Sequence, residues 1–260
     1  MTHLTVLGSS NAIPSPEHNN THFVIITPER KVLVDCGSNP MVSIQLGGEE
    51  VNGITDIILT HFHPDHISGL PLLLMDMWLM GRRHPLNVYG LEYTIDRVES
   101  MMELFSWTDW PNFYKVNFIR VALDDRATVL NNEQMRIYSS PVKHFLPNIC
   151  LRIELKAEEK VIAYSCDTEP CQAVVDIASG ADILLHEASG PFTGHSSAAQ
   201  AGEAARRAEV GALYLIHYPT GRYASGDIIA EAKASFSGKV VQAVDFMKID
   251  LNKSSKMSDN

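Results

Sequence analysis

The sequence predicts an α/β fold in which two mixed β-sheets pack face to face and helices cover both outer surfaces, a four-layered αββα sandwich. A strand-rich stretch followed by interleaved helices occurs twice along the chain, which is the pattern expected of two such halves. The 260 residues are 45% hydrophobic and 20% charged, which is enough apolar material for one large core. No linker or low-complexity segment divides the chain. We therefore expect one domain over residues 1–251 and a polar, disordered tail over residues 252–260.

In the first half of the chain, short runs of β-branched and apolar residues are separated by turn residues. Runs of this length, bounded by Gly, Pro, Asn or Asp, predict strands. The expected strands are residues 4–7, 21–27, 31–34, 54–60, 86–89 and 115–121. Two longer segments predict helices instead: residues 70–80 are almost wholly apolar, as in a buried helix, and residues 93–104 suit a surface helix.

In the second half, strands and helices alternate more regularly. The expected strands are residues 128–130, 135–139, 149–155, 161–164, 183–186, 212–216, 240–242 and 247–251. The expected helices are residues 172–179, 198–208 and 227–235, of which the second is rich in Ala, the strongest helix former. Strands that alternate with helices in this way favour parallel pairing within a sheet.

Composition and charge limit the functions that the chain can have. The formal net charge of −10 argues against wide, non-specific binding to nucleic acid, which depends on Lys and Arg clusters, but leaves room for a small anionic substrate. The four cysteines include no Cys-x-x-Cys pair, so neither a zinc knuckle nor a disulfide framework is expected. No signal peptide precedes the first strand, and the longest apolar run contains Asp76 and is too short for a bilayer. The sequence therefore predicts a cytoplasmic protein with no membrane partner.

Four side chains that can bind a metal, His61, His63, Asp65 and His66, lie within six positions at the end of an apolar strand. His61 and His63 are two residues apart, so at a strand end both side chains point the same way. Asp65 and His66 follow a proline that ends the strand, and they open a helix that continues through residue 70. Such a turn aims two ligands at one metal and two at a second. The alternative is a polar turn that is rich in His by chance, and the density of ligands favours the metal site.

A two-metal centre needs more ligands than this motif supplies. Three further candidates, His144, Asp167 and His217, each come after a predicted strand. A carboxylate at Asp167 could bridge both ions with its two oxygens. A lone His at a strand end is more often a hydrogen-bonded core or surface residue, but the shared placement of the three favours ligation.

Several motifs, spread over nearly the whole chain, resemble one family. They lie at residues 7–10, 13–15, 33–37, 60–72, 85–90, 164–168, 186–188, 195–198, 215–218 and 222–223. In these motifs the chain resembles hydrolases of the metallo-β-lactamase fold, and among them it is most similar to ribonuclease Z and its phosphodiesterase relatives. The metal motif is common to the whole superfamily, whereas residues 186–188 together with 195–197 are typical of the phosphodiesterase branch.

The resemblance implies a dinuclear zinc centre with seven ligands. They are His61, His63 and His144 for one ion, Asp65, His66 and His217 for the other, and Asp167 as the bridge. Imidazole and carboxylate ligands suit Zn²⁺, and Mn²⁺ or Fe²⁺ are alternatives with the same ligand types.

Two ions about 3.5–4 Å apart hold a shared water and lower its pKa, so a bridging hydroxide is the expected nucleophile. The leaving alkoxide then needs a proton, for which His195, in a loop before the Ala-rich helix, is the expected general acid. The resemblance implies that Glu187 holds the His195 ring as a cation, which raises its pKa. Asp65, beside the water, could relay a proton as well as bind metal. The alternative for His195 is a Ser-rich helix cap that contains a His by chance.

The chain departs from the ribonuclease Z pattern in ways that bear on its substrate. Proteins that process transfer RNA usually carry a long arm between the third His ligand and the bridging Asp, whereas here residues 145–166 suffice only for two strands and a turn. Residues 38–40, Ser-Asn-Pro, also differ from the family's usual sequence. Without the arm, and with a negative net charge, tight binding of folded transfer RNA is disfavoured, and a small phosphodiester or an RNA 3′ end is expected. Homodimers are common in the family, and one is expected here.

Two alternative classes of function stay open at this point. The same scaffold could hydrolyse a sulfate ester, a lactone or a β-lactam, or the chain could be a non-catalytic module that binds metal or nucleic acid.

The aromatic segment 105–114 could form a lid over the metals or stack on a base, but a core or dimer contact is the simpler interpretation. Among the remaining histidines, His22 suits a loop or surface position unless the opening loop folds over the site, and His186 is expected to point away from the face of Glu187 and to support the site from behind.

Overall fold

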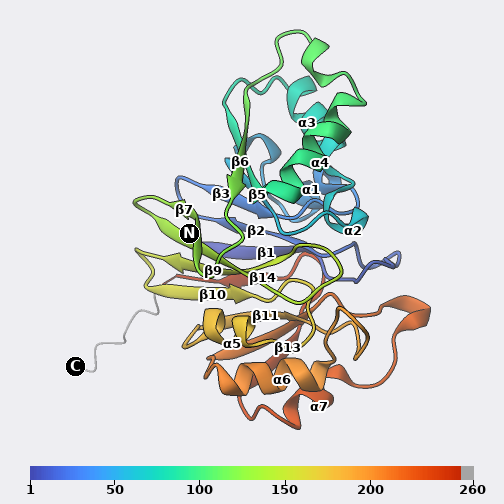
Figure 1. The fold of residues 1–260 in the computed structure, drawn as a ribbon, viewed down its shortest axis with the longest axis vertical. Coiled ribbons are helices and arrows are strands. Elements are labelled where there is room, and N and C mark those ends of the chain that lie inside the picture. Colours follow the sequence, from blue (N-terminus) through green and yellow to red (C-terminus); the bar gives the residue numbers. More distant parts are fainter. Residues whose placement is uncertain (253–260) are drawn as a thin grey trace.

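The computed structural model describes residues 1–252, so the predicted tail lies, apart from Asn252, outside the described residues. Two seven-stranded sheets pack face to face, and helices cover the outer surface of each (Figure 1). The predicted four-layered sandwich is therefore confirmed.

The first sheet has the strand order β14-β1-β2-β3-β4-β5-β6. Its strands are β1 (His3–Gly8), β2 (His22–Ile26), β3 (Lys31–Val34), β4 (Asp56–Leu59), β5 (Leu86–Leu91), β6 (Val116–Val121) and β14 (Lys248–Asp250). The strands from β3 to β6 run parallel, whereas β14, β1, β2 and β3 pair antiparallel.

The second sheet has the strand order β13-β12-β11-β10-β9-β8-β7. Its strands are β7 (Ala127–Asn131), β8 (Met135–Pro141), β9 (Ile149–Leu155), β10 (Lys160–Tyr164), β11 (Ile183–Glu187), β12 (Ala212–Ile216) and β13 (Lys239–Gln242). The strands from β10 to β13 run parallel and those from β7 to β10 antiparallel. Each half of the chain thus builds a sheet with one parallel and one antiparallel part, except that β14, from the C-terminal end, joins the first sheet. Every predicted strand is present.

Helices cover the sheets from outside (Figure 1). Those of the first half are α1 (Pro40–Leu46), α2 (Pro64–Ile67), α3 (Leu70–Leu79) and α4 (Glu92–Glu103), and those of the second half are α5 (Gln172–Ala178), α6 (Ala198–Arg207) and α7 (Ile228–Lys233). One apolar cluster fills the space between the sheets, where the rings of Phe23 and Tyr164 meet edge to face at 5.1 Å, and another lies under each helical layer. Within residues 1–252, the helices are all too short or too polar to cross a membrane.

Two helical features differ from the prediction. Helix α1 was not predicted, although Pro40 stands at its start and the Asn39 side chain accepts a hydrogen bond from the backbone N–H of Val42. The helix expected to run from Asp65 through residue 70 is broken, because α2 ends at Ile67 and α3 begins anew. Pro71 explains the break, since its ring excludes a continuous helix over the four preceding residues.

The aromatic segment 105–114 contains the short 3₁₀ turn η2 (Trp107–Asp109) and packs on the outer side of the first sheet. Trp110 stacks on Trp78 of α3 with ring centroids 5.3 Å apart, and Trp107 meets Phe118 of β6 at 5.6 Å. These contacts favour the packing interpretation of the segment over a lid.

Candidate metal centre

The predicted site residues meet at one edge of the two sheets, where the parallel strands end. His61 follows β4, Asp167 follows β10, His217 follows β12, and Glu187 is the last residue of β11. His144 comes from the loop after β8 of the second sheet. Ligand sites of open α/β sheets lie at the carboxyl ends of strands, where loops from neighbouring strands converge.

Four side chains, His61, His63, His144 and Asp167, form what we call the first donor group. Nδ1 of His63 lies 2.9 Å from Nε2 of His61 and 3.0 Å from Nε2 of His144. Oδ2 of Asp167 lies 3.9 Å from Nε2 of His61. Donor atoms around a tetrahedral zinc are roughly 3.4 Å apart when each bond is about 2.0–2.1 Å long. The spacing of this group therefore suits one small cation.

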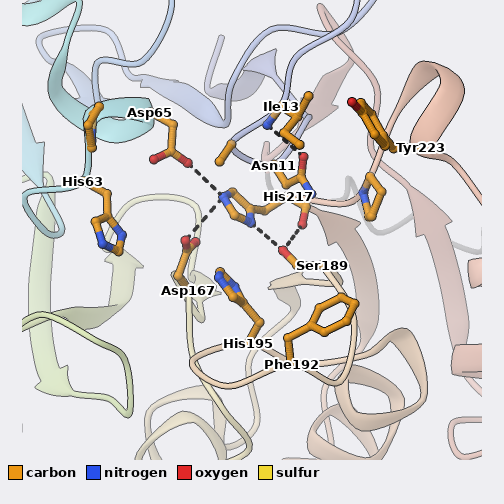
Figure 2. A pocket seen from close by; sticks show the side chains of 13 residues that line it. Asn11, Ile13, His63, Asp65, Asp167, Ser189, Phe192, His195, His217 and Tyr223 are labelled. Atoms are coloured by element: carbon orange, nitrogen blue, oxygen red, sulfur yellow. Dashed lines mark hydrogen bonds and ion pairs between the residues drawn. The ribbon is translucent and has the colours of Figure 1, made fainter.

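Asp65, His66, Asp167 and His217 form the second donor group. Nε2 of His66 lies 3.5 Å from both Oδ2 of Asp65 and Oδ2 of Asp167. Nε2 of His217 lies 3.5 Å and 3.3 Å from the same two oxygens (Figure 2). Because Asp167 belongs to both groups, it occupies the position that a bridging carboxylate requires.

Two buried polar atoms in this cluster have no hydrogen-bond partner among the described residues: Nε2 of His66 and Oδ1 of Asp167. Buried polar groups are nearly always paired, and an unpaired one needs an explanation. Both atoms belong to the second donor group, and imidazole nitrogen with carboxylate oxygen is a donor set that suits zinc. The residues therefore fit a divalent cation.

Asp35, which follows β3, holds one of the histidines from behind. Its Oδ2 lies 2.8 Å from Nδ1 of His66, and the hydroxyl and the backbone N–H of Thr60 donate to the same carboxylate. This carboxylate fixes which nitrogen of His66 faces the centre. The sequence prediction assigned no role to Asp35, because its contact with His66 depends on the parallel pairing of β3 with β4.

Three other histidines of the centre, His61, His144 and His217, are held at Nδ1 by neutral groups. Nδ1 of His144 lies 2.7 Å from the carbonyl oxygen of Gly194, and Nδ1 of His217 lies 2.8 Å from the hydroxyl of Ser189. Nδ1 of His61 lies 3.2 Å from the hydroxyl of Thr60. Each of these rings thus directs its Nε2 toward the shared centre.

The backbone takes the left-handed conformation at three positions around the centre. Asp35, Cys166 and His217 have φ values of 62°, 51° and 52°. Non-glycine residues rarely adopt this conformation, and the cost is of order 1–3 kcal/mol at each position. Each lies just past the end of a strand, so the sharp turn brings the side chain, or that of the next residue, back toward the edge of the sheets.

The two donor groups differ in electrostatics. Burial lowers the pKa values of all three histidines in the first group, that of His144 to about 4, so these rings are neutral and offer a lone pair. In the second group burial also acts to lower the pKa values of His66 and His217, but nearby carboxylates, Asp167 first, outweigh burial and raise both. The carboxylates of the second group therefore favour the protonated form of both its imidazoles, and a divalent cation would have to displace those protons.

His195 and Glu187 lie beside the donor groups and contact each other. Nδ1 of His195 lies 3.0 Å from Oε1 of Glu187, which also accepts the backbone N–H of Thr168, while Oε2 accepts that of Ser189. Burial raises the pKa of Glu187. Burial also acts to lower the pKa of His195, but the hydrogen bond that the His195 ring donates to Glu187 outweighs this effect and raises the pKa of His195. Glu187 thus favours the imidazolium form and leaves Nε2 of His195 available to the cavity.

Two other histidines, His22 and His186, lie outside both donor groups. His22 is fully buried within β2, so the prediction of a loop or surface position is wrong; β2 is covered on both faces, which its own sequence does not reveal. His186 does point away from the centre, and its Nδ1 lies 2.8 Å from the carbonyl oxygen of Glu187, on the side of β11 that faces α5 and α6.

A cavity of about 580 Å³ opens over the centre. His63, Asp65, Asp167 and His217 lie on one side of it, and His195 lies below them (Figure 2). The remaining wall contains apolar side chains, among them Phe192. Donors from both groups and His195 therefore line the same cavity.

Comparison with known proteins agrees with this geometry. Residues 30–218, well over half of the chain, match the family described as "Beta-lactamase superfamily domain". The chain belongs to the beta-lactamase superfamily. Within this superfamily, the Ribonuclease Z of Methanothermobacter thermautotrophicus is 28% identical over 96% of this chain and 97% of that protein. The Ribonuclease Z of Archaeoglobus fulgidus is 28% identical over 95% of this chain and 97% of that protein.

The predicted resemblance to ribonuclease Z is thus confirmed, and so, at the level of these relatives, is a metal-dependent hydrolase. The alignment with the Methanothermobacter protein spans 306 positions, whereas this chain has 260 residues, so that relative contains segments that this superfamily member lacks. Between His144 and Asp167, this chain has only the β9–β10 hairpin, as predicted.

Solved structures show the same fold. Human tRNase Z, short form, superimposes with a TM-score of 0.79 at 24% identity, over 96% of this chain and 99% of that one. The metallo-beta-lactamase fold protein YhfI of Bacillus subtilis superimposes with a TM-score of 0.78 at 22% identity, over 95% and 98% of the two chains. At these identities the likeness shows the fold alone.

Proposed function

We propose that the chain is a phosphodiesterase that depends on two zinc ions. The observation that carries this proposal is that two donor groups share Asp167 at the mouth of one cavity, with the His195–Glu187 pair beside them. In this proposal the first donor group holds one ion, the second holds the other, and Asp167 bridges them. Mn²⁺ or Fe²⁺ could replace zinc with the same ligand types.

The bound ions would activate a water molecule and offset negative charge on the phosphate. The protein's own residues do the rest. His195 donates a proton from Nε2 to the leaving oxygen, and Glu187 is the positioning residue that keeps the ring charged and oriented. Asp65, whose pKa is lowered below its usual range chiefly by His66 and His217 against the effect of burial, is ionised and can relay a proton within the cavity.

The substrate that fits best is a small phosphodiester or an RNA 3′ end. The net charge of −10 disfavours a long nucleic-acid contact, and the short β9–β10 hairpin offers little surface to a folded transfer RNA. The cytoplasmic location and the homodimer stay predictions of the sequence.

The first test combines metal content with turnover. We expect dialysed, zinc-loaded protein to retain two ions per chain and to hydrolyse bis(p-nitrophenyl) phosphate, and a chelator to abolish the reaction until zinc is restored. His84→Ala, an exposed histidine elsewhere on the surface, is the matched control and should change neither quantity. Two bound ions without turnover of any phosphodiester would move the function to a sulfate ester, lactone or β-lactam. RNA binding by metal-free protein would instead support a non-catalytic module.

The role of His195 has its own test. His195→Ala should lower turnover of a diester with an alkoxide leaving group by about 10²–10⁴-fold, because that oxygen needs a proton. Bis(p-nitrophenyl) phosphate should lose much less, because p-nitrophenolate leaves without one. Metal content should stay at two ions per chain. An equal loss on both substrates would contradict the acid role.

A further inference from the structure

The half of the cavity that faces away from the metal donors is lined by large apolar side chains that remain open to solvent. Ile13, Phe192 and Tyr223 are 50%, 67% and 47% exposed, and all three line the cavity of the donor groups. They come from the opening loop, the loop before α6 and the loop after β12 (Figure 2). Exposed apolar surface gathered around a polar centre marks a ligand-binding wall, because water solvates it poorly.

The loop that carries Phe192 is fixed by its own hydrogen bonds. The N–H of Gly190 donates to the carbonyl of Ser196 at 3.0 Å, that of Phe192 donates to Gly190 at 2.8 Å, and that of His195 donates to Phe192 at 3.0 Å. Gly190 has a φ of 128°, and a Cβ atom at that position would lie 2.5 Å from the Phe192 ring. These bonds therefore fix the backbone of Phe192 within the loop that carries His195, and the Phe192 ring lies against Gly190.

The other two walls are also held in place. The guanidinium of Arg222 donates to the Tyr223 hydroxyl at 2.7 Å, and its central carbon lies 4.8 Å from the centre of the Tyr223 ring. The Ser10 hydroxyl donates to the carbonyl of Ile13 at 2.9 Å. The apolar half is thus preformed, and a ligand that enters it pays little ordering cost.

We propose that this apolar half is a subsite for a nucleobase of the leaving group, with Phe192 and Tyr223 as its aromatic walls. The inference rests on the proposed phosphodiesterase function. Phe192 lies on the same loop as His195, so a base stacked on it brings its own sugar oxygen close to the group that protonates that oxygen. Stacking on aromatic side chains accepts every base, since each has a π-face, so the subsite selects nucleotides without reading sequence.

The test uses diesters that differ only in the leaving group. Dithymidine monophosphate is compared with the methyl esters of thymidine 5′-phosphate and thymidine 3′-phosphate, in which methanol replaces one nucleoside or the other. Phe192→Ala should lower kcat/KM for the dinucleotide by about 5- to 150-fold and leave the methyl ester with a methanol leaving group unchanged. Phe192→Trp should keep the dinucleotide preference, and zinc content should stay at two ions in both variants.

Phe105→Ala removes a phenylalanine of similar exposure, 54%, that lines a different cavity, and it should have no effect. An equal loss on all three diesters in Phe192→Ala would overturn the subsite. A binding measurement keeps the two proposals separable: by calorimetry, the protein should bind thymidine monophosphate about 5- to 150-fold more tightly than methyl phosphate, and Phe192→Ala should erase the difference. Absence of diester turnover with this binding preference intact would refute the phosphodiesterase and keep the subsite, whereas equal binding of both phosphates would refute the subsite.

Discussion

The two donor groups share one carboxylate but are built differently. The first group consists of three imidazoles and Asp167, and the atoms behind its rings are neutral: the hydroxyl of Thr60 and the carbonyl of Gly194. The second group has two imidazoles and two carboxylates, and a third carboxylate, Asp35, lies behind His66. The second group therefore contains two carboxylates and is contacted by a third, whereas the first group contains one.

Exposure divides the histidines less sharply. His63 and His144 of the first group are partly exposed but His61 is buried, whereas both histidines of the second group, His66 and His217, are buried and its Asp65 is partly exposed. Because the interaction of a cation with a carboxylate strengthens away from water, the second group, which has more carboxylates and two buried histidines, should bind a divalent ion more tightly. Both groups contribute side chains to the cavity wall, so the difference between them lies in the number of carboxylates rather than in access to the cavity.

Removing the shared carboxylate should break both groups at once. In Asp167→Asn we expect fewer than one zinc per chain and a fall in phosphodiester turnover of about 10³-fold or more, because several kcal/mol of transition-state stabilisation depend on the ions. Plasma emission spectroscopy measures the metal and a chromogenic diester the turnover. Asp176→Asn, an exposed carboxylate on α5, is the control. A variant that kept two ions would exclude Asp167 as the bridge.

The sequence was sufficient to predict the parts of the fold and site that depend on local pattern. Every strand was predicted within a few residues because alternating apolar runs and turn residues lie next to each other in the chain. The seven candidate donors came from residue chemistry at strand ends, and the structure gathers all of them into the two groups.

Features that depend on distant contacts could not be predicted in this way. The burial of His22 follows from packing on both faces of β2, and the role of Asp35 follows from the pairing of β3 with β4, neither of which is written in the neighbouring residues. The left-handed backbone at Cys166 is imposed by the surroundings, since nothing in this residue type favours it. By contrast, α1 could have been predicted, because Asn39-Pro40 is a typical helix start.

A smaller effect on metal affinity should follow from changing Asp35, which contacts a ligand of the second group only. Asp35→Asn keeps the size of the side chain but removes the charge behind His66, and we expect affinity for one of the two zinc ions to fall about 10- to 100-fold. The other ion should be unaffected. Competition with a chromophoric chelator measures both affinities. Asp56→Asn, a buried carboxylate paired with Arg30 at the opposite end of β4, controls for general loss of stability, and a fall in metal affinity there would mean that folding, not the contact with His66, is responsible.

The smallest expected effect is a difference in the order of metal loss. If negative charge sets affinity, a graded chelator titration of the wild-type protein should remove the ion of the first group before that of the second, with the two steps separated by at least about tenfold in free zinc, which corresponds to roughly 1.4 kcal/mol. His144→Ala removes a ligand of the first group only, so it should abolish the weaker step and leave the tighter one in place. His217→Ala should do the reverse, leaving only a weak step. A single step in wild-type protein, or loss of the tight step in His144→Ala, would show that Asp167 couples the two ions so strongly that the difference in carboxylate number no longer decides which ion leaves first.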